Sequence, residues 1–152
     1  MKNIKLFVVG AGSIGKRHVR NAISLGISPD NIISLDKRDD RLEEVRELGV
    51  KNLFKDFDIA IKENFDAAII CSPTSMHIEQ SLKLAKLNKH LLIEKPLDSK
   101  LDGSEELLKI SESNKLTIMI AYIFRFSPTI KFIKQKLQEK IIGKILYFRG
   151  EF

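Results

Sequence analysis

The residues most suited to chemistry in this 152-residue chain begin with the glycine-rich segment Gly10-Ala11-Gly12-Ser13-Ile14-Gly15. It follows an apolar run and opens a helical pattern, which is the context in which three glycines at this spacing bind a dinucleotide. Gly10 permits a tight turn, Gly12 lets the backbone approach a pyrophosphate, and Gly15 lets the helix pack closely on the strand. The free N–H groups that begin this helix, near Ser13 and Ile14, favour phosphate.

An acidic residue, Asp36, ends the next apolar run. Its distance from the glycines is near the spacing at which an acid accepts hydrogen bonds from the adenosine ribose of a dinucleotide. The same carboxylate repels the 2′-phosphate of NADP, so Asp36 favours NAD. Lys37 and Arg38 follow directly and are able to bind that phosphate from the side, so NADP stays an open alternative.

Polar residues also follow two later apolar runs. Ser72, Pro73 and Thr74 come after the run that ends at Cys71, and Glu94-Lys95-Pro96 comes after another. In open parallel sheets this position is the edge where ligands bind. A lysine that ends a buried run is costly unless its ammonium meets a ligand or a carboxylate. A lysine there can hold a substrate hydroxyl while hydride leaves the same carbon.

The elements that position these residues alternate along the chain. Continuous apolar runs predict strands buried on both faces, at 4–9, 31–35, 66–71, 90–94 and 116–122. Helical patterns lie between them, at 13–25, 40–48, 75–87 and 101–113. We expect Thr74 or Ser75 to cap the third of these helices and Asp102 or Ser104 the fourth. The alternation predicts an α/β fold, a doubly wound parallel sheet covered by helices on both faces.

The pattern changes after residue 122. A helix over about 127–140 is opened by Ser127-Pro128, and a turn at Gly143 leads into an alternating, strand-like segment over 145–152. Leu146, Phe148 and Phe152 fall on one face of that predicted strand, and a lone strand cannot cover such a face. We therefore expect a dinucleotide-binding domain over 1–124, and over 125–152 a connecting helix and the first strand of a second, truncated α+β domain.

Composition excludes several other classes of protein. The net charge of +6 arises almost entirely within 125–152, where lysines alternate with apolar residues as on the solvated face of an amphipathic helix. This arrangement argues against nucleic acid as a partner. No apolar stretch is long enough for a membrane span, and no signal peptide precedes the first strand, so we expect a cytoplasmic protein. The single Cys71 is expected to be a reduced thiol, and no cysteine or histidine cluster suggests a metal site.

Four ordered motifs resemble one known family. The segments GAGSIGKRH (10–18), CSPTSMH (71–77), EKP (94–96) and YIFRF (122–126) are similar to the N-terminal half of the glucose-fructose oxidoreductase, inositol dehydrogenase and rhizopine catabolism (Gfo/Idh/MocA) family. The resemblance implies a Rossmann domain in which the loop after residue 71 supports the cofactor and His77 lies near it. It also implies that Lys95 orients the substrate hydroxyl and that Arg125 is able to reach the same cleft.

The predicted site is therefore as follows. The predicted catalytic residue is Lys95, and the predicted cofactor-binding residues are Gly10, Gly12, Ser13, Ile14, Gly15, Asp36, Lys37, Arg38, Cys71, Ser72, Pro73, Thr74, His77, Glu94, Lys95 and Arg125. His18 matches a family position and is expected to have a packing role.

The resemblance implies the cofactor half of an NAD(P)-dependent oxidoreductase acting on a sugar, a polyol or a related secondary alcohol, and we expect a homo-oligomer. In similar enzymes a second domain supplies a catalytic histidine, so we expect this chain to bind cofactor without turnover. Two alternatives stay open: a non-catalytic module that senses a dinucleotide, and a nucleic-acid-binding domain that uses the basic C-terminal segment.

Overall fold

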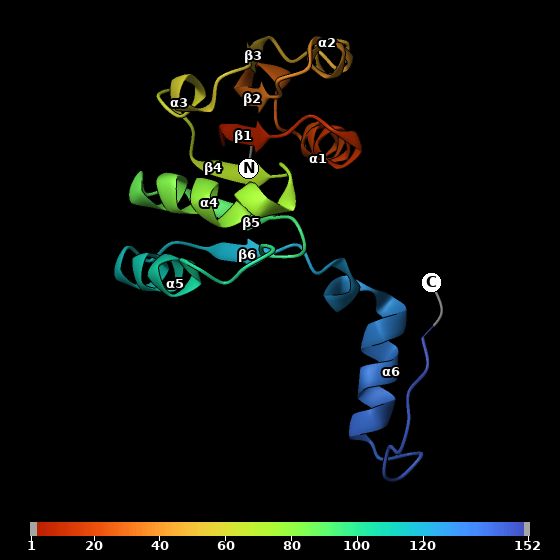
Figure 1. The fold of residues 1–152 in the computed structure, drawn as a ribbon. Coiled ribbons are helices and arrows are strands. Elements are labelled where there is room, and N and C mark those ends of the chain that lie inside the picture. Colours follow the sequence, from red (N-terminus) through yellow and green to blue (C-terminus); the bar gives the residue numbers. More distant parts are fainter. Residues whose placement is uncertain (1–2, 151–152) are drawn as a thin grey trace. The chain divides into compact units, whose positions relative to one another are not determined.

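The computed structural model describes residues 3–150, and its main feature is a parallel sheet of six strands (Figure 1). The strands are β1 (Leu6–Val9), β2 (Ile32–Leu35), β3 (Asn52–Phe54), β4 (Ala67–Ile70), β5 (His90–Ile93) and β6 (Ile118–Ile120). Their order across the sheet is β3-β2-β1-β4-β5-β6, and every neighbouring pair is parallel. The predicted doubly wound parallel sheet is confirmed.

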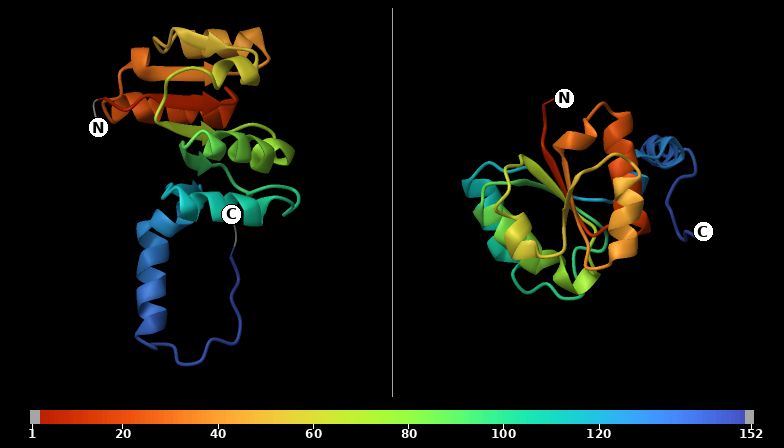
Figure 2. Two further views of the ribbon diagram at one scale, coloured as in Figure 1. Left: turned by 90° about the vertical axis from the view of Figure 1, so that its left-hand side faces the viewer. Right: turned by 90° about the horizontal axis from the view of Figure 1, so that it is seen from above.

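Helices cover both faces of this sheet (Figure 2). The helices α1 (Ser13–Ser24) and α2 (Asp39–Arg46) pack on one face, while α3 (Phe57–Ala60), α4 (His77–Lys86) and α5 (Ser104–Ser113) pack on the other. Two short 3-10 helices, η1 (Pro29–Asn31) and η2 (Thr74–Met76), precede β2 and α4. This arrangement gives the domain one apolar core on each side of the sheet.

The first strand shows why the apolar runs form central strands. All four residues of β1 are buried, because alternate side chains enter opposite cores. Phe7 and Val9 pack beneath α3, α4 and α5, while Leu6 and Val8 pack beneath α1 and α2. A strand placed between two cores needs apolar residues at every position, which is the pattern that the sequence carries.

Besides the 3-10 helices, one strand and one α-helix were missing from the sequence-based prediction. The strand β3 lies at the edge of the sheet, has only three residues and begins at the exposed Asn52, so it carries no continuous apolar run. The helix α3 is a single turn, capped by the Asp56 carboxylate, which accepts a hydrogen bond from the Ile59 N–H at 2.9 Å. Elements this short have too few residues to show a period.

The predicted caps of α4 were wrong. Neither Thr74 nor Ser75 caps this helix, because Thr74–Met76 form the 3-10 helix η2 and α4 begins after Met76 with no capping side chain of its own. Its first-turn Ile78 N–H instead donates to the Asp98 carboxylate at 2.9 Å. This carboxylate comes from the segment that follows β5, so the cap is a tertiary contact.

The predicted caps of α5 were also wrong. The residue that precedes the helix is Gly103, at a φ of +88°, and no side chain caps the helix. A Cβ at Gly103 would lie 2.9 Å from the Ile78 side chain on α4. The close approach of α5 to α4 therefore selects a glycine where Asp102 or Ser104 was expected to be the cap.

The chain divides into two compact units, the first ending at Ala121 and the second starting at Tyr122. The second unit holds a 3-10 helix, η3 (Ile123–Phe126), and α6 (Pro128–Gln138). The predicted start of this helix is confirmed, because Ser127 precedes it and its hydroxyl accepts a hydrogen bond from the Ile130 N–H at 3.5 Å.

The strand predicted over 145–152 does not form in the described residues. Residues 145–150 have no regular structure, and Phe152 lies outside the described part of the chain. A strand requires a neighbour that satisfies its backbone groups, and none of the described strands pairs with this segment. Leu146 and Phe148 are 88% and 70% exposed.

None of the helices in residues 3–150 combines the length and the apolar character that crossing a membrane requires.

The exposed apolar segment predicts self-association. We expect light scattering to show an average mass that rises with concentration, because contiguous exposed apolar side chains favour burial against another copy. The double substitution Leu146→Ser and Phe148→Ser should restore the monomer mass without changing the melting temperature of the chain. A mass that is independent of concentration in the unmodified chain would show that these side chains drive no association.

Candidate cofactor site

The predicted site residues of the first unit gather at one edge of the sheet. The strand order reverses between β1 and β4, and in open parallel sheets the carboxyl ends of the strands at such a reversal are where ligands bind. The glycine-rich turn follows β1, Asp36 follows β2, Ser72 lies just beyond β4, and Lys95 lies just beyond β5. The parallel topology thus brings together residues that are far apart in the sequence.

Two of the three glycines are required by the fold itself. Gly10 has a φ of +98°, and a Cβ there would lie 2.6 Å from the Cys71 carbonyl oxygen. A Cβ at Gly15 would lie 1.8 Å from the Gly10 carbonyl oxygen. These contacts confirm the tight turn at Gly10 and the close helix-to-strand packing at Gly15.

The protein itself leaves space at Gly12. A Cβ there would meet only the Arg41 guanidinium, at 3.9 Å, and its φ of −65° is accessible to any L-residue. Packing within the chain therefore does not explain this glycine. The open space beside its backbone is what a phosphate group would need.

The N-terminus of α1 is open to a ligand of negative charge. It has no capping side chain and no acidic residue in its first turn, whereas α2, α4 and α5 each carry an acidic residue there. Ser13 and Ile14, which begin the helix, are exposed. The positive end of the helix dipole is thus left uncompensated at the edge of the sheet.

Asp36 is buried, with 8% of its surface exposed, and it holds the glycine-rich turn to the end of β2. One carboxylate oxygen accepts hydrogen bonds from the Ala11 N–H at 2.9 Å and from the Arg41 guanidinium at 3.3 Å. The other accepts from the Arg38 N–H at 3.0 Å. This carboxylate therefore lies beside Gly12, where the adenosine ribose of a bound dinucleotide would be recognised.

The cations next to Asp36 are arranged differently from the sequence-based expectation. The Arg38 side chain forms two hydrogen bonds with the Asp40 carboxylate, at 3.0 Å and 2.5 Å, and this pairing raises the pKa of Arg38. Lys37 is exposed. Arg41, five positions beyond the acid, is the cation that contacts Asp36. Sequence reasoning missed Arg41, although its place in the first turn of the next helix was a usable signal.

The loop after β4 is fixed by side chains of α4. The Ser72 hydroxyl donates to the Gln80 side-chain oxygen at 2.6 Å, while Pro73 is exposed and Thr74 is half-buried. Cys71 is half-buried at the start of this loop, and burial, reinforced by the negative charge of Glu94, raises the pKa of its thiol to about 12. The thiol is therefore protonated and unreactive at neutral pH.

His77 joins two loops of the site. The side chain is 1% exposed, and its two ring nitrogens lie 2.9 Å from the Ser72 carbonyl oxygen and 3.0 Å from the Pro96 carbonyl oxygen. Carbonyl oxygens only accept hydrogen bonds and a neutral imidazole carries a single N–H, so the ring nitrogen that carries the hydrogen donates to the carbonyl oxygen it faces, while the other nitrogen lies close to the second carbonyl oxygen. His77 thus ties the loop after β4 to the loop after β5.

The segment after β5 is held from α1. The Glu94 carboxylate lies 2.9 Å from the His18 ring nitrogen, and its other oxygen accepts a hydrogen bond from the Lys95 N–H at 3.2 Å. The Lys95 side chain is exposed, so its ammonium is hydrated and carries no cost of burial. Among residues 3–150 no salt bridge engages that ammonium, which leaves it available to a ligand.

Two further findings delimit the site. Arg125 is exposed in η3, within the second unit, so its predicted role stays a prediction.

In the described part of the chain no group of three or more His, Cys, Asp or Glu residues is placed to hold a metal ion.

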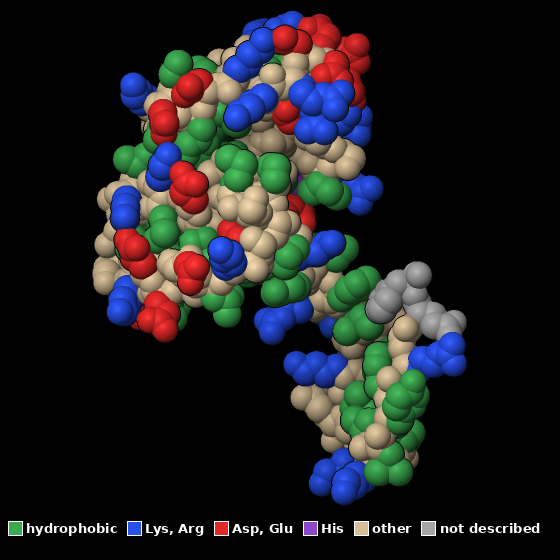
Figure 3. Space-filling view, in the orientation of Figure 1, with side chains coloured by type: hydrophobic (Ala, Val, Ile, Leu, Met, Phe, Trp, Pro, Cys, Tyr) green, Lys and Arg blue, Asp and Glu red, His purple; other side chains and the backbone are tan. Residues whose placement is uncertain are grey.

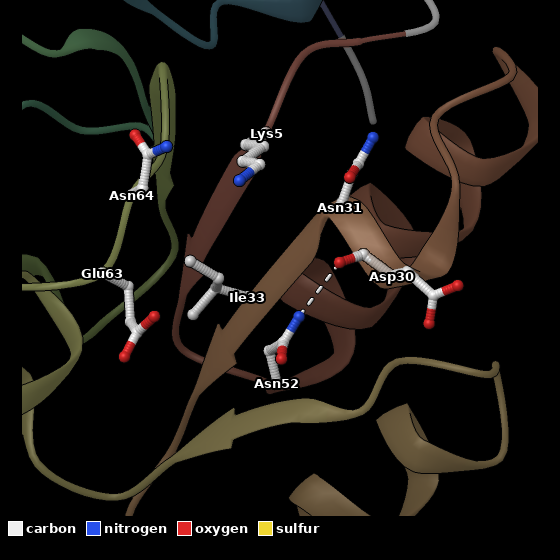
Figure 4. Close-up of a pocket in the computed structure, with 7 residues that line it drawn as sticks. All are labelled: Lys5, Asp30, Asn31, Ile33, Asn52, Glu63 and Asn64. Atoms are coloured by element: carbon white, nitrogen blue, oxygen red, sulfur yellow. Dashed lines mark hydrogen bonds between the residues drawn. The ribbon is translucent and has the colours of Figure 1, made fainter.

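A separate pocket of about 200 Å³ lies at the opposite edge of the sheet (Figure 4). It is lined by Lys5, Asp30, Asn31, Ile33, Asn52, Glu63 and Asn64. These residues precede or begin β1, β2, β3 and β4, so the pocket lies at the amino ends of the strands. It contains none of the predicted site residues.

Comparison with known proteins identifies the family. A family model described as "Oxidoreductase family, NAD-binding Rossmann fold" (Gfo/Idh/MocA) matches residues 4–122. The chain belongs to this family. The Gfo/Idh/MocA resemblance seen in the sequence motifs is therefore confirmed, as are the Rossmann fold and the assignment of a nicotinamide cofactor.

Individual relatives of this Gfo/Idh/MocA chain are dehydrogenases. It is 32% identical over 143 residues to a myo-inositol 2-dehydrogenase of Thermotoga maritima, covering 93% of this chain and 42% of the relative. It is also 32% identical over 95 residues to a scyllo-inositol 2-dehydrogenase (NADP(+)) of Bacillus subtilis, covering 62% and 28%. The chain therefore spans less than half the length of these relatives.

A solved structure supports the same relationship. The scyllo-inositol dehydrogenase of Lactobacillus casei, with bound NAD(H) and scyllo-inositol, superposes with a TM-score of 0.82 at 27% identity. The match covers 95% of this chain and 43% of that structure.

Substitution of Gly12, which has open space beside it, should affect cofactor binding, whereas substitution of Gly15, which is tightly packed, should affect stability. Gly12→Val should leave the chain folded, at a cost of about 1 kcal/mol in helix capping, and should weaken NAD binding at least tenfold by filling the space for phosphate. Gly15→Ala should instead destabilise the fold, because its Cβ would clash with the Gly10 carbonyl. Thermal unfolding and calorimetry separate the two effects. Unchanged NAD affinity in folded Gly12→Val would contradict the phosphate assignment.

Proposed function

We propose that this chain is the cofactor-binding half of an NAD(P)-dependent oxidoreductase that transfers hydride between the nicotinamide and a sugar, a polyol or a related secondary alcohol. The observation that carries the proposal is the open space at Gly12 beside the uncapped N-terminus of α1, with the Asp36 carboxylate next to it. Together these features match the pyrophosphate and the ribose of a dinucleotide.

The residues at the carboxyl edge of the sheet have separate roles in the proposed function. The N–H groups at Ser13 and Ile14 hold the pyrophosphate, and Asp36 accepts from the adenosine ribose. The loop from Ser72 to Thr74, at the end of β4, borders the cofactor on the side away from Asp36. The cofactor supplies the hydride chemistry, and the protein supplies orientation and electrostatics.

Lys95 is the proposed catalytic residue of this half. Its ammonium is hydrated at the carboxyl end of β5, and its backbone is fixed by Glu94, which His18 holds in turn. A cation there can donate a hydrogen bond to the substrate hydroxyl and favour loss of its proton. The relatives include an NAD(+)-dependent and an NADP(+)-dependent scyllo-inositol 2-dehydrogenase of Bacillus subtilis, which supports a polyol-like substrate.

A complete reaction requires residues beyond this half. We propose that residues 125–152 begin a second domain, which supplies the proton acceptor and most of the substrate pocket. The chain spans only 42% and 43% of the inositol dehydrogenases of Thermotoga maritima and Lactobacillus casei. On this basis the 152-residue chain binds cofactor without turnover.

Calorimetry with NAD, NADH, NADP and NADPH tests the proposal. We expect one site per chain, tighter binding of NAD than of NADP, and no oxidation of inositol or glucose when NAD is added. Absence of binding by all four dinucleotides in a folded chain would contradict the proposed function.

Asp36 is expected to set the preference for NAD. The substitution Asp36→Ser should improve NADP affinity relative to NAD about tenfold, which corresponds to ~1.4 kcal/mol, because it removes a negative charge from the neighbourhood of the 2′-phosphate. The measurement is the ratio of the two dissociation constants, with thermal unfolding as the control for loss of the hydrogen bond to Ala11. A ratio that does not move would show that Asp36 does not face the ribose.

A further inference from the structure

We propose that His77 is a positioning residue that joins the loop after β4 to the loop after β5 only while both of its ring nitrogens carry a hydrogen. When the ring is neutral, one of the two loops is released. The link itself requires no ligand, and its importance for hydride transfer rests on the proposed function.

The position of the His77 ring leaves both nitrogens facing the backbone. The residue begins α4, and its side chain is 1% exposed. Nε2 lies 2.9 Å from the Ser72 carbonyl oxygen and Nδ1 lies 3.0 Å from the Pro96 carbonyl oxygen. Both separations are those of a formed N–H···O hydrogen bond.

The hydrogens on the ring decide how many of these two contacts are favourable. A neutral imidazole has one N–H and one nitrogen lone pair, whereas an imidazolium has two N–H groups. A carbonyl oxygen has no hydrogen to donate, so the contact of the neutral ring's second nitrogen sets one lone pair against another. Only the doubly protonated ring makes both contacts hydrogen bonds, and each is then strengthened by the charge of the ring.

Burial makes the unmatched contact costly. Solvent has little access to a side chain that is 1% exposed, so water does not readily replace a missing hydrogen bond there. Two buried acceptors that face each other leave both without a donor. A neutral ring should therefore keep one carbonyl oxygen as its acceptor and let the loop that carries the other move away.

The charges around His77 are compatible with a cation. The Asp98 carboxylate accepts a hydrogen bond from the N–H of Ile78, the residue after His77, so a negative charge lies near the start of α4. In Figure 3 acidic and basic side chains are interspersed over α4 and α5, so no large field of one sign acts on this region. The other titratable groups on the elements around the ring are Cys71, Glu79, Glu94, Lys95, Glu105 and Glu106.

The two carbonyl groups belong to the parts of the site that must be held at a fixed separation. Ser72 lies in the loop that is proposed to border the cofactor, and Pro96 follows Lys95, the proposed catalytic residue. Small displacements of reacting groups reduce the rate of a reaction strongly. The buried ring of His77 therefore acts through these loops, by setting where Lys95 lies relative to the cofactor.

Nuclear magnetic resonance of the full chain without ligand tests the link. Between about pH 5 and 8, where histidine normally changes charge, the ring ¹⁵N resonances report which nitrogens of His77 carry a hydrogen. Carbon-detected spectra give the carbonyl resonances of Ser72 and Pro96, including the one that precedes a proline. We expect one of these two resonances to move with the same midpoint as the His77 ring, because its hydrogen bond is lost when the ring becomes neutral.

Two variants separate the proton-dependent link from simple packing. His77→Gln has an amide that donates hydrogen bonds but does not titrate, so the movement of the carbonyl resonance with pH should disappear. His90→Gln is the matched control, because His90 is exposed and its Nδ1 accepts from the Thr117 N–H, and it should leave the movement unchanged. A His77 ring that keeps the same hydrogens throughout, or carbonyl resonances that stay fixed while the ring titrates, would overturn the proposal even if His77→Gln does not fold.

Calorimetry with NAD connects the link to the cofactor. Raising the pH through the midpoint of the His77 ring should weaken NAD binding about two- to tenfold, the effect of one hydrogen bond, in the unmodified chain and in His90→Gln. The same pH change should have no such effect in His77→Gln, and an equal pH dependence there would overturn the positioning role. Failure of the unmodified chain to bind NAD at any pH would instead overturn the proposed function, and the titration of the free chain would still decide whether the link exists.

Discussion

The contact on which the site depends is the approach of two backbone segments at Gly10 and Gly15. A single Cβ at Gly15 would lie 1.8 Å from the Gly10 carbonyl oxygen, so α1 begins directly against the end of β1 only because both positions lack a side chain. The tight turn places the start of α1 at the carboxyl end of β1, the strand that pairs with β4. It also brings the Ala11 N–H to the Asp36 carboxylate, which fixes the acid beside the open space at Gly12.

The loops after β4 and β5 are fixed by histidines rather than by glycines. His77 spans the carbonyl oxygens of Ser72 and Pro96, and His18 holds Glu94, the residue before Lys95. Each of these contacts lies at the carboxyl edge of the sheet, beyond the ends of β4 and β5. The parallel topology thus brings these loops and α1 to one edge of the sheet, where the histidine contacts hold them together, and a fixed geometry is what the positioning of reacting groups requires.

The sequence predicted the strands that are buried on both faces. Sequence-based prediction failed where the local structure depends on contacts with residues far away in the chain. Central strands such as β1 carry an unbroken apolar run because two cores demand it, whereas the edge strand β3 carries no such run. In the segment 145–150 the side chains alternate as in a strand, but no neighbouring strand pairs with it. The alternation alone therefore did not suffice to form a strand. The glycines and Asp36 could be predicted from local spacing. The cap from Asp98 and the pairing of Arg41 with Asp36 could not, since each depends on which side chain reaches across in three dimensions.

The central claim, that the dinucleotide binds at the carboxyl edge over the glycine-rich turn, is tested most directly by nuclear magnetic resonance. In a titration of the ¹⁵N-labelled chain with NAD, we expect the largest amide shifts at Ala11, Ser13 and Ile14, with smaller shifts at Ser72. Shifts confined to the pocket at the amino ends of the strands, around Asn52, would contradict it.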